Sequence, residues 1–480
     1  VIQVDGADGD AASDDGVSFH GPYFMSHREV DDGPRRGLAR FGECPIRGAT
    51  DRTGDGLSAR RSRGDTGSPP PGPGEGPGLP GWLAIGLLVA GALFFPIYWI
   101  VYGHGLLDAR FVDAKSFWLG ARLALAEGLS PYPWEAFSAA SERTPGGYAH
   151  PFVYPPPSLV LLWPLAGLSY DQATTALLLT SHAGLLLTAL GCGRILYGEG
   201  AWQSRVALAV VAGVAMFLAA SHAARVTLGH GQVNVVVVCG LVWYWAACLG
   251  RAPAAVGAAG LVVATLLKPY FGVFALYLLL PEGKRLRAPV LALAAALVAV
   301  AALAVPPAAW GDWVRIYLLG LSSEGLYLGR FEVYAAENYA LRAALDAVLG
   351  PGTRALWPWL VPLMALAQLA AILRVRAGPA DARTVQMAGL TLLVFLAAPV
   401  SWVHYLLYAV LAAALVGVIA LRGGRPGLAS VAGLTGAALL HPPALGLVHP
   451  LAVYAPVLLA TLLWGACVAQ AATRGALAPA

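Results

Sequence analysis

A few polar side chains interrupt otherwise apolar stretches of this chain, and they are the residues that could do chemistry. The first is Asp113, within FVDAKSFWLGARLALAEG. A carboxylate in such a place can act as a general base that takes a proton from a hydroxyl group. Asp108, five residues earlier, is the alternative base. Asp113 also has a purely structural interpretation, because an acid at the start of a helix is favoured by the helix dipole.

Lys268 is one of three lysines in the chain and lies inside an apolar run, directly before Pro269. If that run crosses a membrane, a charge within it is costly and indicates function by default. We expect its ammonium to neutralise a phosphate group. The alternative is that the long side chain only extends to the membrane interface.

Two further polar breaks lie between apolar runs. His230 and Gln232 belong to the sequence GHGQVN, where an imidazole and an amide could face a sugar or a phosphate, or could merely cap a helix. His404 heads an apolar run in SWVHY, with the same two interpretations. Tyr154 stands before three prolines that form a rigid entry to the next helix.

A second polar, aromatic interval covers residues 306–349, and within it Glu337 and Asn338 are candidates for contact with an acceptor. Aromatic side chains beside polar groups suit stacking on a sugar, although aromatic belts at a membrane interface produce a similar pattern. Walker, Rossmann, HExxH and GxSxG patterns do not occur, so nucleotide-binding and hydrolase motifs give no support. The five cysteines show no CxxC spacing, so no metal site or disulfide framework is predicted.

The elements that must position these residues are membrane helices. The 480 residues are 58% hydrophobic and only 12% charged, whereas a soluble domain carries roughly 25% charged residues. Apolar runs of about 18 residues or more recur, and in lipid such runs form helices. We therefore predict an all-α, polytopic helical membrane protein with about 11–13 transmembrane helices.

Charge distribution separates a tail from the membrane domain. Residues 1–80 contain 13 acids and nine arginines, are rich in Gly and Pro, and are predicted to be a disordered cytoplasmic tail. Residues 81–474 form the predicted membrane domain, with a first span at 82–102. The residues from 112 to 126 have the spacing of an amphipathic helix on the membrane surface.

Arginines and lysines in the short loops give the topology. They place both termini in the cytoplasm. They place two large loops, 107–158 and 306–349, outside together with the polar breaks around His230, Lys268 and His404. This assignment treats 157–168 as a segment that does not cross, 206–226 as one span, and 253–280 as a hairpin broken at Lys268.

Taken together and in order, these motifs resemble glycosyltransferase family 87, within the C-type superfamily of polyprenyl-phosphate-sugar-dependent enzymes. The matching pieces are Asp113 with FWLGARLALAEGLSPYP, then FVYPPP, LGHGQVN, ATLLKP, the EN pair at 337–338, and SWVHY. The family often has an aromatic residue directly after the first-loop Asp, where this chain has Ala114.

The resemblance implies an inverting hexosyltransferase that uses a polyprenyl-phosphate sugar, commonly mannose, on the extracytoplasmic side. Asp113 would be the base. Lys268 and His404, with Gln232, His230 and Tyr154, would bind the donor phosphate or sugar. No cofactor is implied, and a divalent metal stays open. The implied partners are the lipid-linked donor, a lipid or glycan acceptor and membrane lipids, with no nucleic acid.

The runner-up function is a multipass lipid or sugar transporter or flippase. Such a protein would show internal repeats and paired discontinuous helices around a central site. The Ala, Gly and Arg bias of the sequence indicates a GC-rich bacterial genome, and we predict location in the bacterial inner membrane.

Overall fold

The structure is a computed structural model that describes residues 111–145, 149–202, 204–318, 338–376, 378–398, 401–440, 442, 445 and 450–475. The chain divides into two units, Val1–Pro69 and Pro70–Ala480, and all described residues belong to the second. The predicted tail, the first predicted span at 82–102, Asp108 and Glu337 lie outside the described residues.

The first half of the described chain contains α2 (Val112–Ala121), η1 (Arg122–Ala126), α3 (Trp134–Glu142), α4 (Pro156–Ala166), α5 (Tyr170–Tyr197), η2 (Gly198–Trp202), α6 (Arg205–Ala220), α7 (His222–His230), α8 (Asn234–Cys248), α9 (Ala254–Leu267), η3 (Pro269–Leu279) and η4 (Pro281–Leu286). The second half contains α10 (Arg287–Ala304), α11 (Pro307–Trp313), η5 (Val314–Leu318), α13 (Leu341–Leu349), η6 (Pro351–Leu356), α14 (Trp357–Val375), α15 (Ala380–Ala397), η7 (Val403–Tyr405), α16 (Leu406–Arg422), α17 (Pro426–Leu440), η8 (Pro450–Tyr454) and α19 (Ala455–Gly475).

The prediction of an all-α, polytopic membrane protein is confirmed, since the described ranges contain helices and no strand. Within the described ranges, six helices are long and apolar enough to cross a membrane: Tyr170–Gly200, Pro281–Ala304, Pro351–Val375, Ala380–Ala397, Val403–Arg422 and Leu451–Ala471. A bent pair, α6 with α7, makes a possible seventh crossing, and five shorter apolar helices occur beside them. The number of crossings stays a prediction.

Two helix breaks lie near the polar motifs. The predicted span at 206–226 is not one straight helix, because α6 and α7 meet at an angle of 62° at Ser221, and whether the pair crosses as one span stays a prediction. The Ser221 hydroxyl accepts a hydrogen bond from Ala224 N at 3.2 Å, which satisfies a free N–H group at the start of α7. At the predicted second break, Lys268 has extended backbone angles and Pro269 cannot donate the next helical bond.

Helix α2 does not lie on a surface. The predicted amphipathic surface helix is wrong in this respect, since every residue from Asp113 to Ala121 is buried. Its polar side chains bond to the chain that surrounds it: Lys115 Nζ donates to the Ser141 carbonyl at 2.9 Å, and Trp118 Nε1 donates to the Leu168 carbonyl at 2.9 Å. The helix is therefore a packed internal element of the first polar interval.

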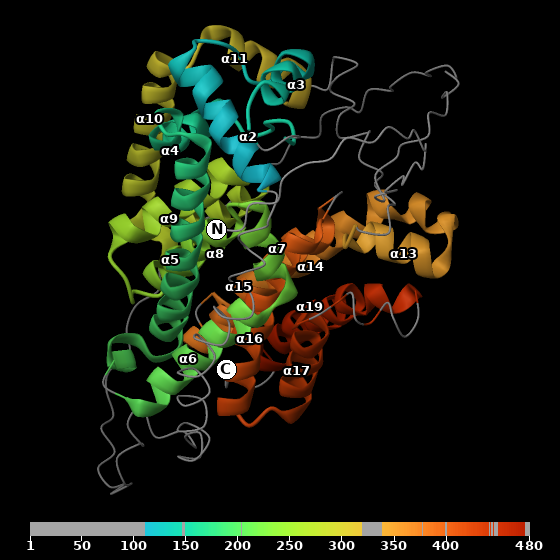
Figure 1. Ribbon diagram of the computed structural model, residues 1–480. Coiled ribbons are helices and arrows are strands. Elements are labelled where there is room, and N and C mark those ends of the chain that lie inside the picture. Colours follow the sequence, from blue (N-terminus) through green and yellow to red (C-terminus); the bar gives the residue numbers. More distant parts are fainter. Residues whose placement is uncertain are drawn as a thin grey trace, which may run out of the picture. The chain divides into compact units, whose positions relative to one another are not determined.

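The two long polar intervals contact each other. Trp313 Nε1 donates to the Val153 carbonyl at 3.4 Å, and the rings of Tyr132 and Tyr317 lie 5.9 Å apart. In Figure 1, α2, α3 and α11 accordingly gather at the same end of the helices α4 and α10. The described residues 307–318 of the second interval therefore lie against the first interval.

Close helix packing holds the centre of this domain together. Helices α8 and α9 approach each other where Gly240 faces Gly260, so closely that a Cβ at position 240 would lie 2.5 Å from the Gly260 carbonyl oxygen. Small residues at such crossings let backbones approach and are a major source of helix association in membranes.

We expect Gly240→Ala to lower the free energy of unfolding by about 1–3 kcal/mol, because the added methyl group must push two backbones apart. The matched control is Gly465→Ala in α19, where nothing lies within 4 Å of the new methyl group. The control should leave stability unchanged or raise it, since Ala favours a helix over Gly. Thermal unfolding in detergent measures both. An equal loss in the two variants would contradict the packing argument.

Candidate active site

The site begins with Asp113 in the first turn of α2. Its side chain is buried, and its Oδ2 atom lies 3.6 Å from His230 Nδ1 at the end of α7. The N-cap residue of α2 is Phe111, and no side chain caps this helix end. Asp113 therefore faces a histidine from a distant segment, in a position that the helix dipole also favours.

Gly231 makes this approach possible. It ends α7 in the left-handed conformation, with φ of 66°, and Gly231 N and Gln232 N donate to the carbonyls of Leu228 and Thr227 at 3.0 and 2.8 Å. This pair of bonds is the Schellman arrangement, which normally requires glycine. A Cβ at Gly231 would overlap the Cβ of Ala114, which follows Asp113 directly. The small Ala114, in place of the aromatic residue common in the resembled family, fits this close contact.

Asp113 is held in its charged form. Burial alone raises the pKa of this carboxyl, but the hydrogen bond from His230 and the charges of His150, His404 and His230 outweigh burial and lower the pKa to about 2. Sequence reasoning did not select His150. Its carbonyl oxygen accepts a hydrogen bond from Ser116 Oγ of α2, which keeps residue 150 beside this helix.

Lys268 occupies the break between α9 and η3 and is 5% exposed. Its Nζ atom donates to the Tyr405 hydroxyl at 2.9 Å, and it lies 4.6 and 5.3 Å from the ring centroids of Tyr405 and Tyr154. Among the described residues, no carboxylate forms an ion pair with Lys268. A buried ammonium that only neutral groups surround attracts an anion strongly.

His404 connects the two charged groups. Its ring lies 6.4 Å from the ring of His230 and 4.7 Å from the ring of Tyr405. Within the described ranges, the buried atoms His404 Nδ1 and Gln232 Oε1 have no hydrogen-bond partner. Since buried polar atoms are normally paired, both atoms are available to a ligand.

Asn338 holds the second polar interval against the segment that carries His404. Its Oδ1 atom accepts hydrogen bonds from Ser401 N at 2.8 Å and Ala340 N at 3.0 Å, and Tyr339 N donates to the Ser401 carbonyl at 2.6 Å. The side-chain oxygen of Asn338 is therefore engaged by the backbone. In this structure the residue positions its neighbours rather than presenting that oxygen to an acceptor.

Asn234 holds the same segment from the other side. Its Nδ2 atom donates to the His404 carbonyl at 3.5 Å, and its Oδ1 atom accepts from the Tyr408 hydroxyl at 2.8 Å. Asn234 is fully buried at the first position of α8, so it fixes His404 relative to the GHGQVN break.

The structure thus brings most of the predicted site residues into one cluster. We call the set joined by these contacts the polar cluster: Asp113, Tyr154, His230, Lys268, His404 and Tyr405. Gln232 is buried two residues after His230. Tyr405 was not selected from the sequence, although its position directly after His404 could have indicated it. Asp108 and Glu337 lie outside the described residues. Among the residues that the structure describes, no group of three or more possible metal ligands occurs.

The model of glycosyltransferase family 87 matches residues 152–399, which is more than half of the chain. The matched range includes Tyr154, His230, Gln232 and Lys268, whereas Asp113 and His404 flank it. No curated protein and no solved structure matches this chain.

The contact between Gly231 and Ala114 can be tested with two glycines of similar backbone conformation. Gly231→Ala and Gly128→Ala both place a side chain at positive φ, 66° and 68°, which costs about 1–2 kcal/mol. Only Gly231→Ala also clashes with Ala114, since nothing lies within 4 Å of a Cβ at Gly128. We expect Gly231→Ala to lower the melting temperature in detergent further than Gly128→Ala does, by the equivalent of about 1–3 kcal/mol. Equal losses would show that α7 does not press against α2.

Proposed function

The chain belongs to glycosyltransferase family 87 and is a membrane glycosyltransferase, and from this premise we propose the details of its reaction. The donor is a polyprenyl-phosphate hexose, with mannose as the sugar. The acceptor is a lipid or a glycan, and transfer inverts the anomeric centre. The family match favours an enzyme over the transporter or flippase that the sequence left open.

The observation that carries this proposal is the arrangement of charge in the polar cluster. A buried carboxylate, Asp113, and a buried ammonium, Lys268, lie in one cluster but are not paired with each other. His230, His404 and Tyr405 stand between them in a chain of contacts. Sugar transfer from a lipid phosphate needs both groups. The carboxylate takes the proton that leaves the acceptor hydroxyl, and the ammonium stabilises the negative charge that develops on the donor phosphate.

The step is a single displacement. The acceptor hydroxyl oxygen bonds to the anomeric carbon, and the bond from that carbon to the phosphate oxygen breaks. The electron pair of the broken bond leaves with the polyprenyl phosphate, and the proton of the acceptor hydroxyl passes to Asp113. Because attack and departure occur on opposite faces of the sugar, the configuration inverts.

Lys268 stabilises the leaving phosphate. A cation aimed at the point where charge develops acts strongly in a buried site, because little water screens it. Tyr405 fixes the ammonium through the 2.9 Å hydrogen bond, and the ring of Tyr154 lies beside it. His404 Nδ1 and Gln232 Oε1 supply further polar contacts for the phosphate or the sugar hydroxyls.

Asp113 is a weak base in the empty site, since its pKa is about 2. A weak base suits a transfer in which the bond to the leaving group breaks early. The acceptor hydroxyl then becomes strongly acidic only as its oxygen bonds to the anomeric carbon, so the proton moves late. The histidines keep the carboxylate ionised and oriented until that moment.

We further propose that the polar cluster opens to the extracytoplasmic side of a bacterial inner membrane and that both termini are cytoplasmic. Loop arginines support this orientation, by their bias toward the cytoplasm. The contact between Trp313 and Val153 supports it as well, because it joins a residue of the first polar interval to a residue of the second.

The central test uses membranes that contain the full chain and radiolabelled polyprenyl-phosphate mannose. We expect Asp113→Asn to reduce sugar transfer by about 10²–10⁴-fold, the usual contribution of a general base. Asp171→Asn is the matched control, an exposed acid in the first turn of α5 that takes no part in the polar cluster. Full activity of Asp113→Asn would refute the mechanism, and loss in Asp108→Asn alone would move the base to Asp108.

A second prediction concerns pH. His230→Gln removes a hydrogen bond and a charge that lower the pKa of Asp113, so this pKa rises. The acidic limb of the pH–activity profile should therefore shift to higher pH, and activity should fall less at neutral pH than at acidic pH. His182→Gln, on the middle of α5, is the control and should leave the acidic limb in place. An unchanged acidic limb in His230→Gln would show that His230 does not lower the pKa of Asp113.

A further inference from the structure

A long 3₁₀-helix begins directly after Lys268. This helix, η3, covers Pro269–Leu279, and the N–H group of Phe271 donates to the Lys268 carbonyl at 3.0 Å, three residues back, as this helix type requires. Runs of 3₁₀-helix usually extend over only three or four residues. The 11 residues of η3, next to the polar cluster, are therefore an unusual feature of this fold.

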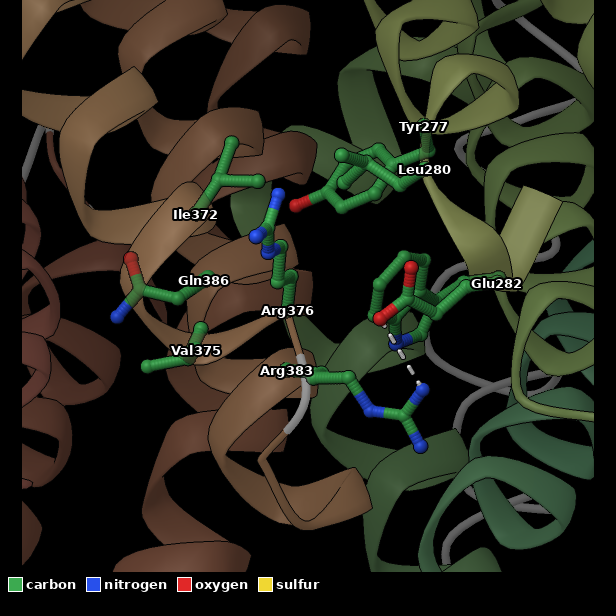
Figure 2. A pocket seen from close by; sticks show the side chains of 9 residues that line it. Tyr277, Leu280, Glu282, Ile372, Val375, Arg376, Arg383 and Gln386 are labelled. Atoms are coloured by element: carbon green, nitrogen blue, oxygen red, sulfur yellow. Dashed lines mark hydrogen bonds and ion pairs between the residues drawn. The ribbon is translucent and has the colours of Figure 1, made fainter. Parts of the chain in front are cut away.

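One face of η3 is buried against the bundle. Phe271, Phe274 and Tyr277 recur every three residues, and all three are buried. Tyr277 shares a small pocket with Ile372 of α14 and Gln386 of α15 (Figure 2). This face therefore fixes η3 in place along its whole length.

A second face of η3 forms an exposed apolar stripe. It consists of Tyr270, Val273, Leu276 and Leu279, and we call these four residues the η3 stripe. Val273 is half-buried, whereas Tyr270, Leu276 and Leu279 are exposed, at 38%, 42% and 74%.

The 3₁₀ geometry makes this stripe continuous. Three residues per turn place side chains three positions apart directly above one another. In an α-helix, the nine residues from Tyr270 to Leu279 would make about two and a half turns, so these two side chains would point to opposite sides. The unusual helix type thus aligns the four side chains in one straight row.

The η3 stripe joins the polar cluster at Tyr270. The Tyr270 ring lies 6.2 Å from the ring of Tyr405, edge to face, and the Tyr405 hydroxyl accepts the hydrogen bond from Lys268 Nζ. From Tyr270 to Leu279 the stripe extends about 18 Å. This length is slightly more than half of the roughly 30 Å hydrocarbon core of a bilayer.

We propose that the η3 stripe binds the polyprenyl chain of the sugar donor. This inference rests on the donor proposed above, whose phosphate lies at Lys268. A chain that is covalently attached to this phosphate must leave the polar cluster over an apolar, exposed surface. The η3 stripe is such a surface, and it starts beside the ammonium. The chain passes Tyr270 and then follows Leu276 and Leu279 along the helix.

The test is site-specific photocrosslinking in membranes that contain the full chain. A photoreactive benzophenone residue replaces Leu276 in one variant and Leu187 in another. Leu187 is the matched control, because it is 44% exposed on α5, close to the value for Leu276, and does not belong to the η3 stripe. The probe is radiolabelled polyprenyl phosphate, which has the chain and the phosphate of the donor without the sugar.

We expect strong labelling at position 276 that excess unlabelled polyprenyl phosphate removes, and only weak labelling, insensitive to this competitor, at position 187. Adding Lys268→Gln should reduce the specific labelling at position 276 by about tenfold, since one charge-assisted hydrogen bond to the phosphate is lost. The labelling at position 187 should not change.

Leu276→Trp tests the η3 stripe without altering the polar cluster. The indole covers the middle of the stripe, so the KM for a donor with a long polyprenyl chain should rise by about fivefold. The KM for a mannosyl phosphate with a short prenyl chain, which ends near Tyr270, should stay the same. Leu187→Trp is again the control and should change neither KM.

Three outcomes would overturn the proposal. Equal labelling at positions 276 and 187 would place the chain in bulk lipid. Displacement by equimolar phosphatidylglycerol, as effective as by polyprenyl phosphate, would show that the stripe binds ordinary phospholipids. An equal rise in KM for both donors in Leu276→Trp would show that the stripe does not contact the chain.

Sugar transfer from polyprenyl-phosphate mannose, measured in wild-type membranes, separates this proposal from the proposed function. Transfer together with any of the three outcomes refutes the role of the η3 stripe alone. Specific labelling at position 276 without transfer refutes the proposed reaction and supports the stripe as a binding site for a polyprenyl chain.

Discussion

The contact between Gly231 and Ala114 is the constraint on which the proposed site depends. It brings the end of α7 against the start of α2, two segments that are more than 100 residues apart in the sequence. The contact holds Asp113, in the first turn of α2, within 3.6 Å of His230, at the end of α7. A glycine that is needed to end α7 also supplies the close approach, so one residue meets both requirements.

Residues of the polar cluster lie at breaks in the helices. In lipid, a helix interruption is tolerated where the freed backbone groups find other partners. At Ser221 a side chain caps the next helix, at Gly231 the Schellman bonds close the end, and at Lys268 a 3₁₀-helix continues the run. The breaks at Gly231 and Lys268 each deliver a polar side chain to the polar cluster, which regular helices through the same positions would have turned elsewhere.

Sequence reasoning located the breaks that carry a chemical signature and overlooked those that depend on packing. Lys268 precedes a proline, and GHGQVN contains glycines, so both interruptions could be predicted. Ser221 follows a long apolar run and precedes His222, in a sequence that is compatible with an unbroken helix. Helix α2 shows helical periodicity, but the pattern does not reveal that α3, α4 and residues 149–154 cover it. Tyr405 and Asn338 gain their roles only from partners far away in the chain.

The separation of the two buried charges is as important as their presence. Had Asp113 and Lys268 formed a salt bridge, each would have neutralised the other, and binding a phosphate would require breaking a pair that burial makes strong. Instead, imidazoles adjoin the carboxylate, and phenolic groups adjoin the ammonium. The unpaired ammonium raises the energy of the empty site, and the proposed lipid phosphate would relieve it. In the proposed mechanism, the free energy that the fold gives up by burying Lys268 unpaired would return as affinity for the leaving phosphate.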